Sequence, residues 1–225
     1  MTWLTLAGQV FRKDLRIESR NREGVNTLLF FSALLVFLFR FALGPTEAEV
    51  RQGAPGLLWF AFILTGLWGV ARAFQIEREN DCLESFRLVP GDLGGIYLGK
   101  VLVGCCLMVA TELVILAMFG FFFHLDLWSA TARLVPVLLL GTVGFVAIGT
   151  LFAAITAQLK AREVLLPLLL FPLMIPVLLS ASRLTELALA GESFAAEPHW
   201  LRLLVVFDLV FLVLGYLTFP LVVED

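Results

Sequence analysis

The sequence predicts an all-α membrane protein: one domain over residues 1–225 with six transmembrane helices. Of the 225 residues, 60% are hydrophobic and only 16% are charged, and the chain contains 21 Phe and 5 Trp. Soluble domains average about 25% charged residues. A chain of this length cannot bury so much apolar surface away from water. The composition therefore excludes a soluble globular protein.

Six apolar stretches are long enough to cross a bilayer, whose core of about 30 Å requires about 20 helical residues. They are residues 27–43, 56–74, 97–123, 134–157, 164–181 and 201–223. The Gly- and Pro-containing run at residues 53–56 is expected to open the second stretch. The fifth stretch contains Pro167, Pro172 and Pro176, so we expect its helix to be kinked or broken.

The distribution of positive charge predicts the orientation. Eleven of the 16 Lys and Arg residues lie in the N-terminal segment, in the connection between the second and third stretches with its flanks, and at residues 158–163. Because cytoplasmic loops carry an excess of Lys and Arg, both termini are predicted to be cytoplasmic. The net charge of −3 gives no indication of a nucleic-acid partner.

Residues 1–26 are predicted to form a cytoplasmic or interfacial helix. Apolar residues recur there at helical spacing, and basic residues fill the other face: Leu4, Ala7, Val10, Phe11 and Leu15 against Arg12, Lys13, Arg16 and Arg20. This pattern is typical of a basic amphipathic helix on the inner leaflet. A solvated cytoplasmic tail is the alternative.

The longest cytoplasmic connection, residues 76–96, is predicted to contain a short charged helix that ends at Pro90. Leu83 and Phe86 share one face of this helix. Such a helix, held between two spans, can transmit a movement of a soluble partner to the transmembrane helices. A plain connecting loop is the alternative.

This connection resembles that of the ABC-2 class of ABC transporter permeases. The shared pattern is an acidic-basic-acidic triplet (77–79), Leu-Glu (83–84), Pro90 and Gly-Lys (99–100), although Asp81-Cys82 replaces the usual Gly-Thr pair. In that class the element is the coupling helix that docks on the ATPase subunit. The resemblance implies these ATPase-coupling residues: Glu77, Arg78, Glu79, Leu83, Glu84, Phe86 and Pro90.

Three further blocks resemble the haem exporter protein B (CcmB) family. They are NTLLFF (26–31) with FALGP (41–45); LGTVGFVAIGTLFAA (140–154) with ARE (161–163) and LPLLLFPLMIPVL (166–178); and FDLVFLVLGY (207–216). The resemblance implies a permease subunit of an ABC complex that exports or releases haem at the periplasmic face for c-type cytochrome biogenesis. Haem would be the substrate rather than a stably bound cofactor, and ATP would bind the partner subunit.

The implied partners are a CcmA-like ABC ATPase, CcmC-like and CcmD-like membrane subunits, and a second copy of the chain. Two alternatives stay open. The chain could be a non-transporting assembly subunit that passes ATPase strokes to a haem-handling partner, or an ABC-2 permease for another amphiphile. An enzyme is not predicted, because there is no zinc pattern or Ser-His pair, and Val101 replaces the Ser or Thr that a GxxxxGK motif requires.

Five polar residues in or beside the spans are further candidates. Glu112 and Asp208 lie within apolar stretches, where an ionised group costs at least about 2.5 kcal/mol, so each should either fix packing or line a polar path. Arg40 lies near the outer end of the first stretch and can snorkel. His124 and His199, the only histidines, are predicted at the outer face and are candidates for haem contact.

Overall fold

The computed structural model describes residues 2–20, 22–43, 47–74, 77–78, 92–124, 127–157, 159 and 161–224. Within these ranges the chain is helical and contains no strand, which confirms the predicted all-α class for the described part. The helices are α1 (Trp3–Arg20), α2 (Arg22–Ala42), α3 (Glu47–Arg72), α5 (Gly94–Phe123), α6 (Leu127–Thr156), α7 (Arg162–Ala190), the short 3-10 helix η2 (Phe194–Ala196) and α8 (Pro198–Glu224).

Five of the described helices are long and apolar enough to cross a membrane: α3, α5, α6, α7 and α8. The apolar part of α2, Leu29–Ala42, is shorter than these five. By length and composition the chain is a multi-pass membrane protein.

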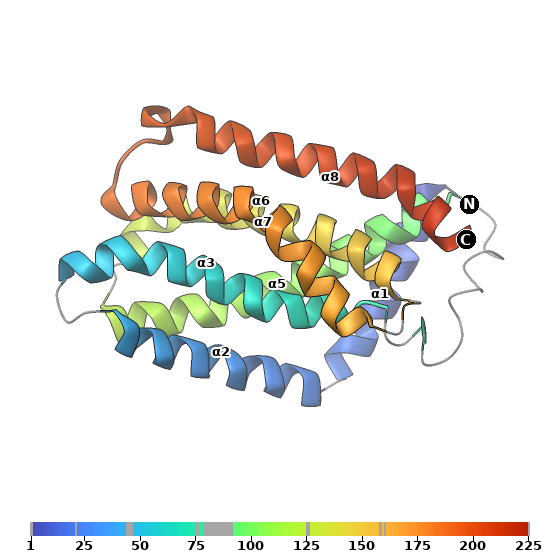
Figure 1. Ribbon diagram of the computed structural model, residues 1–225, viewed down its shortest axis with the longest axis horizontal. Helices are drawn as coiled ribbons and strands as arrows, with labels where there is room; N and C mark the ends of the chain where they lie inside the picture. The colour runs from blue at the N-terminus through green and yellow to red at the C-terminus, as the bar shows by residue number, and fades with distance from the viewer. Residues whose placement is uncertain are drawn as a thin grey trace.

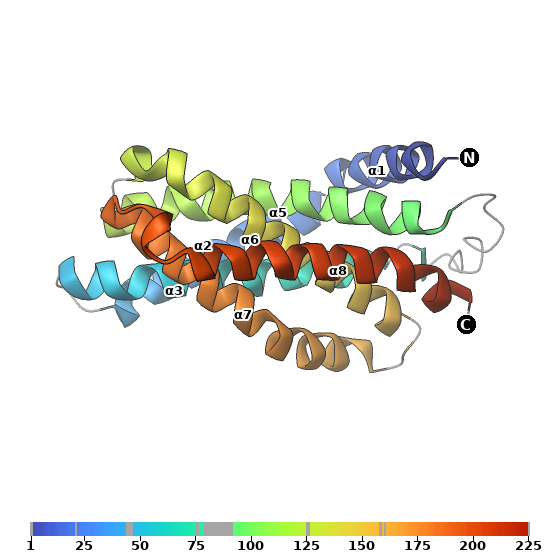
Figure 2. The same cartoon turned by 90° about the horizontal axis from the view of Figure 1, so that it is seen from above.

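The long helices run side by side along one axis, and both chain termini lie at the same end (Figures 1 and 2). α6 is the most deeply buried of the five candidate spans, and it contacts α3, α5, α7 and α8. Large apolar side chains fill the space around it, including Trp59, Phe62, Phe145 and Phe219, each almost fully buried. The core therefore lies along the bundle axis, and lipid-facing residues such as Leu113 and Phe121 lie outside it.

Several helices extend beyond the apolar stretches. α3 begins at Glu47, so the prediction that residues 53–56 open this helix is wrong, and Pro55 lies inside it. A proline removes one backbone donor, and neighbouring helices in a membrane protein can compensate for that loss. α7 likewise continues through Arg183 to Ala190, since charged residues are tolerated where a helix leaves the hydrocarbon core.

α7 shows what its three internal prolines do. It is one unbroken helix from Arg162 to Ala190. Figure 1 shows its first part slanting away from the direction of the rest. The predicted kink is therefore confirmed and the predicted break is not. Bending at proline is the expected response, because the ring clashes with the carbonyl one turn earlier.

α1 packs against the first turns of α5 through glycines. Leu6, Ala7 and Val10 are buried there, and a Cβ atom added at Gly99 would lie 2.8 Å from the Ala7 carbonyl oxygen. A Cβ at Gly95 would lie 2.7 Å from the backbone oxygen of Trp3. Glycine is required at both positions because the two backbones approach so closely. This contact places the next turn of α1 beside the charged end of α5.

Candidate functional site

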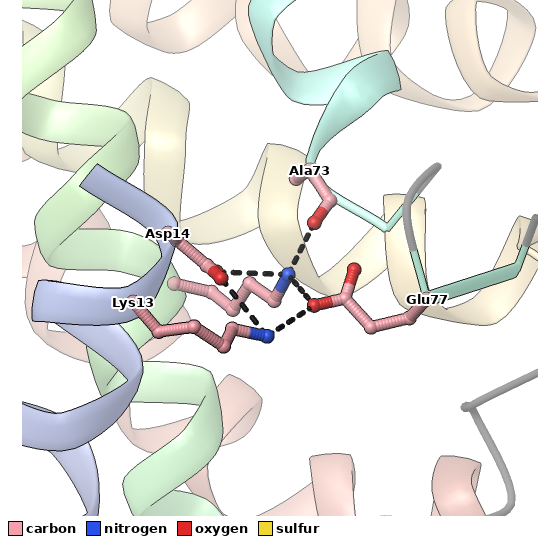
Figure 3. A network of polar contacts seen from close by, with 5 residues as sticks. Lys13, Asp14, Ala73 and Glu77 are labelled. Atoms are coloured by element: carbon pink, nitrogen blue, oxygen red, sulfur yellow. Dashed lines mark hydrogen bonds and ion pairs between the residues drawn. The ribbon is translucent and has the colours of Figure 1, made fainter. Parts of the chain in front are cut away.

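The candidate functional site is a charge cluster made of Lys13, Asp14, Glu77 and Lys100 (Figure 3). Lys100 lies at its centre, with a side chain that is only 3% exposed. Its Nζ atom lies 2.9 Å from Asp14 Oδ2 and 2.8 Å from Glu77 Oε1, and it donates a hydrogen bond to the Ala73 carbonyl. An ammonium group has three donors, so each donor of Lys100 has an oxygen beside it.

The second lysine closes the cluster. Lys13 Nζ lies 2.8 Å from Glu77 Oε1 and 3.0 Å from Asp14 Oδ1. Two cations therefore share two carboxylates, and the cluster has no net charge. The face of the Phe74 ring lies 4.7 Å from Lys100 Nζ, a distance at which a cation is attracted by the ring.

Glu77 is held ionised by its partners. Burial opposes its ionisation, but the charges and hydrogen bonds of Lys100 and Lys13 outweigh burial and lower the pKa of its carboxyl below the ordinary value. For Lys13, burial is likewise outweighed by Glu77 and Asp14, and the pKa of its amine is raised. A buried charge is tolerated only when it is paired in this way.

The charge cluster joins three parts of the chain that are distant in sequence. Lys13 and Asp14 come from α1, Lys100 from α5, and Glu77 from just after the end of α3. Glu77 is also the first residue of the segment that resembles a coupling helix. A displacement that begins in this segment would therefore act directly on α1 and α5.

The structure describes two of the seven ATPase-coupling candidates. Glu77 is 4% exposed and faces inward to the lysines. Arg78 is exposed, and its backbone N–H donates to the Phe74 carbonyl at 3.1 Å. The other five lie outside the described residues, and the coupling helix stays a prediction: Glu79, Leu83, Glu84, Phe86 and Pro90.

Sequence reasoning did not assemble the charge cluster. The sequence pattern placed Lys13 on the basic face of a helix and Lys100 only in the Gly-Lys pair that precedes the third span. Lys100 itself could have indicated such a cluster, because a lysine at the start of a long apolar stretch requires nearby carboxylates. The sequence could not say which carboxylates reach it, since Asp14 and Glu77 lie far away along the chain.

The two intramembrane carboxyl groups approach α6 from different neighbours. Glu112 of α5 is 2% exposed and accepts a hydrogen bond of 2.7 Å from the Thr142 hydroxyl. Asp208 of α8 is 4% exposed, and neither of its carboxyl oxygens has a hydrogen-bond partner among the described residues. Asp208 Oδ1 packs directly over Gly144, where a larger residue would overlap it. The hydrogen bond from Thr142 agrees with the packing alternative for Glu112, whereas the described residues provide no hydrogen-bond partner for Asp208.

The remaining candidates lie at helix ends. Arg40 is half-buried in the last turn of α2. His124 is exposed and ends α5 in the left-handed backbone region, with a φ of 53°. His199 is exposed at the start of α8, and its ring centroid lies 4.8 Å from that of Trp200. Haem contact by either histidine stays a prediction. Within the described ranges, no group of three or more His, Cys, Asp or Glu could hold a metal ion.

Comparison with known proteins identifies the family. The model of the CcmB protein family matches residues 5–224. A protein of Pseudomonas aeruginosa is 33% identical over 191 residues, covering 81% of each chain, and one of Haemophilus influenzae is 32% identical over 183 residues, covering 80% of this chain and 81% of its own. An Escherichia coli protein is 28% identical over 182 residues, with 80% and 81% covered. All three are named heme exporter protein B. Because the family match extends along almost the entire sequence, the chain belongs to the CcmB protein family.

Proposed function

We propose that this chain is the membrane permease subunit of an ABC transporter complex that exports or releases haem at the periplasmic face for c-type cytochrome biogenesis. The observation that carries the proposal is the similarity to proteins named heme exporter protein B over about four fifths of both lengths. The chain works with a separate ATP-hydrolysing subunit, and haem is its substrate rather than a resident cofactor.

The chain crosses the membrane six times, with α2 as the first span. α2 has 21 residues, which at 1.5 Å per residue is about 31 Å. Its apolar part, Leu29–Ala42, is shorter than a bilayer core, and flanking residues that snorkel can accommodate such a shortfall. An even number of spans returns the chain to its starting side, and the position of both termini at one end in Figure 1 supports this count. The excess of Lys and Arg at the same end supports a cytoplasmic assignment in a bacterial inner membrane.

α1 lies at the inner leaflet. One row of its residues packs on α5, while Leu4 is 62% exposed on another side. Arg12, Arg16 and Arg20 are all exposed. An interfacial helix needs an apolar side for lipid and a basic side for anionic headgroups, and these exposures support both.

The conformational change of a CcmA-like ATPase is transmitted to the transmembrane helices through the charge cluster. The ATPase contacts the segment that follows Glu77, and Glu77 passes the displacement to Lys100 of α5 and to α1. The ion pairs of 2.8 to 2.9 Å around Lys100 support this route. CcmC-like and CcmD-like subunits complete the complex.

The coupling role is tested with the double variant Leu83→Asp/Glu84→Lys. Replacing an apolar anchor and reversing a charge in a small interface typically costs 2 kcal/mol or more in binding, so co-purification of the ATPase should fall sharply while membrane levels of this chain stay normal. Leu159→Asp provides the control, because Leu159 is an exposed apolar residue in the connection between α6 and α7, and it should leave ATPase recovery unchanged. Normal ATPase recovery with the double variant would refute the assignment.

The substrate role is tested separately in inverted membrane vesicles that contain this chain and the ATPase but lack the CcmC-like subunit. ATP-dependent delivery of haem to a reporter enclosed in the vesicles supports transport through this chain. Delivery that requires the CcmC-like subunit would instead make this chain an assembly subunit that releases haem from a neighbour.

A further inference from the structure

A cavity of about 660 Å³ lies between α2, α3, α6 and α7. Its walls are largely apolar, with Leu67, Trp68 and Leu166 among the lining residues. Trp68 is 53% exposed and the neighbouring Ala71 is also exposed, so the cavity opens sideways, where the lipid lies. Its volume is within the range of about 300–1,000 Å³ that is usual for small-molecule sites.

The polar end of this cavity carries two arginines from different helices. Arg72 is the last residue of α3 and Arg162 the first of α7, so both lie at the same membrane edge. Both line the cavity and are partly buried. Among the residues that the structure describes, no carboxylate lies within ion-pair distance of either arginine. Within the described residues, neither arginine is therefore neutralised by an ion pair.

We propose that this cavity holds an anionic phospholipid of the glycerol-headgroup type, phosphatidylglycerol. Its phosphate would lie between Arg72 and Arg162, and its acyl chains would lie along the apolar wall. Basic pockets between transmembrane helices at the cytoplasmic face are a recurrent form of lipid-headgroup site.

The charge balance favours this headgroup. Glu163 also lines the cavity, so the described lining residues carry a net charge of about +1, which one phosphate diester neutralises. The Glu163 carboxylate can accept a hydrogen bond from a headgroup hydroxyl. A headgroup without net charge would leave the positive charge uncompensated.

Haem fits the same cavity less well. None of the described residues that line the cavity is a His, Cys, Met or Tyr, so none of them could serve as an axial ligand of the iron. The inference rests on the proposed function only for the membrane position of α3 and α7. Lipid retention by the purified chain involves neither haem nor the ATPase, so failure of this inference and failure of the proposed function give different results.

The test uses the purified chain in nanodiscs of phosphatidylcholine and phosphatidylglycerol in equal amounts, followed by native mass spectrometry of the lipids that remain bound. We expect phosphatidylglycerol to be enriched. Arg72→Gln and Arg162→Gln should each lower the enrichment roughly fivefold, as expected for one basic residue near a membrane surface. Arg202→Gln is the matched control, because Arg202 is an exposed arginine in the first turns of α8, outside the cavity, and it should change nothing.

Ala71→Phe tests how much the apolar space of the cavity contributes to lipid binding, independently of the arginine charges. Ala71 lines the cavity and is exposed, so a larger side chain there should occupy acyl-chain space without disturbing the core. Bound phosphatidylglycerol should fall while the helical circular dichroism and the elution profile stay unchanged. Three results would overturn the proposal. They are equal retention of the two lipids in the unmodified chain, equal losses in Arg202→Gln and the cavity variants, and stoichiometric displacement of the lipid by protoporphyrin.

Discussion

Lys100→Met is the perturbation that tests the charge cluster most directly. Methionine keeps most of the length and volume of the side chain but removes its charge and its three donors. Glu77 and Asp14, whose side chains are 5% and 13% exposed, would then share Lys13 alone. Removing one partner of a buried ion pair typically costs about 3–5 kcal/mol, since the other charge stays buried without full compensation.

Lys13→Met is the matched control. Lys13 contacts the same two carboxylates, but its side chain is 47% exposed and can exchange protein partners for water. Exposed pairs are worth about 0–1 kcal/mol. The structure therefore predicts that two substitutions with identical chemistry in one cluster differ by at least about 2 kcal/mol in their effect on the free energy of unfolding.

The assay is unfolding of the purified chain in mixed micelles, followed by far-UV circular dichroism at neutral pH. The double variant Lys100→Met/Glu77→Gln should lose less than the sum of the two single effects, because each single change leaves a buried charge that the other removes. Equal destabilisation by Lys100→Met and Lys13→Met, or strictly additive single effects, would refute the reasoning.

Three further predictions follow from the same contacts. Gly99→Ala should detach α1 from α5, seen as faster proteolysis within α1, because the added Cβ meets backbone 2.8 Å away; Gly8→Ala, where no atom lies within 4 Å, should change nothing. Glu112→Gln should preserve stability, since the amide can still accept the Thr142 hydroxyl, while Glu112→Leu should cost about 1–3 kcal/mol. Because the folded-state pKa of Glu77 is lowered, the stabilisation that its carboxylate provides should be complete above about pH 4.5 and should disappear as the pH falls through that lowered pKa. The measurement is the free energy of unfolding as a function of pH, and an unchanged loss of stability at acid pH in Glu77→Gln would contradict this.

The orientation is open to a separate check by single-cysteine labelling. Residues near Gln52, Thr131 and Glu192 should react from the periplasm, and those near Arg16 and Arg162 only after the membrane is opened, because cytoplasmic loops carry the excess of Lys and Arg. Labelling at Ser85 is the most informative test, since labelling from the periplasm would refute both the predicted topology and the coupling assignment.

The sequence by itself determined the class of the protein and its family. An apolar content of 60% with few charges indicates a membrane protein. Its long apolar stretches favour helices, because only helices and closed barrels satisfy the hydrogen bonding of every backbone group in lipid. The bend in α7 was also predictable, since a proline acts on its own turn of helix. These properties depend on composition and on neighbours along the chain.

The tertiary structure alone decided which distant groups meet. Whether Glu77 faces a partner protein or a buried lysine depends on how α1 crosses α5, and that crossing depends on the missing side chains of Gly95 and Gly99. The same holds for Asp208, whose lack of a hydrogen-bond partner among the described residues is evident only after α8 is placed against α6. The sequence shows which residues need a partner, but the Coulomb and hydrogen-bond energies fall off over a few ångströms, so only the packing of the helices assigns the partners.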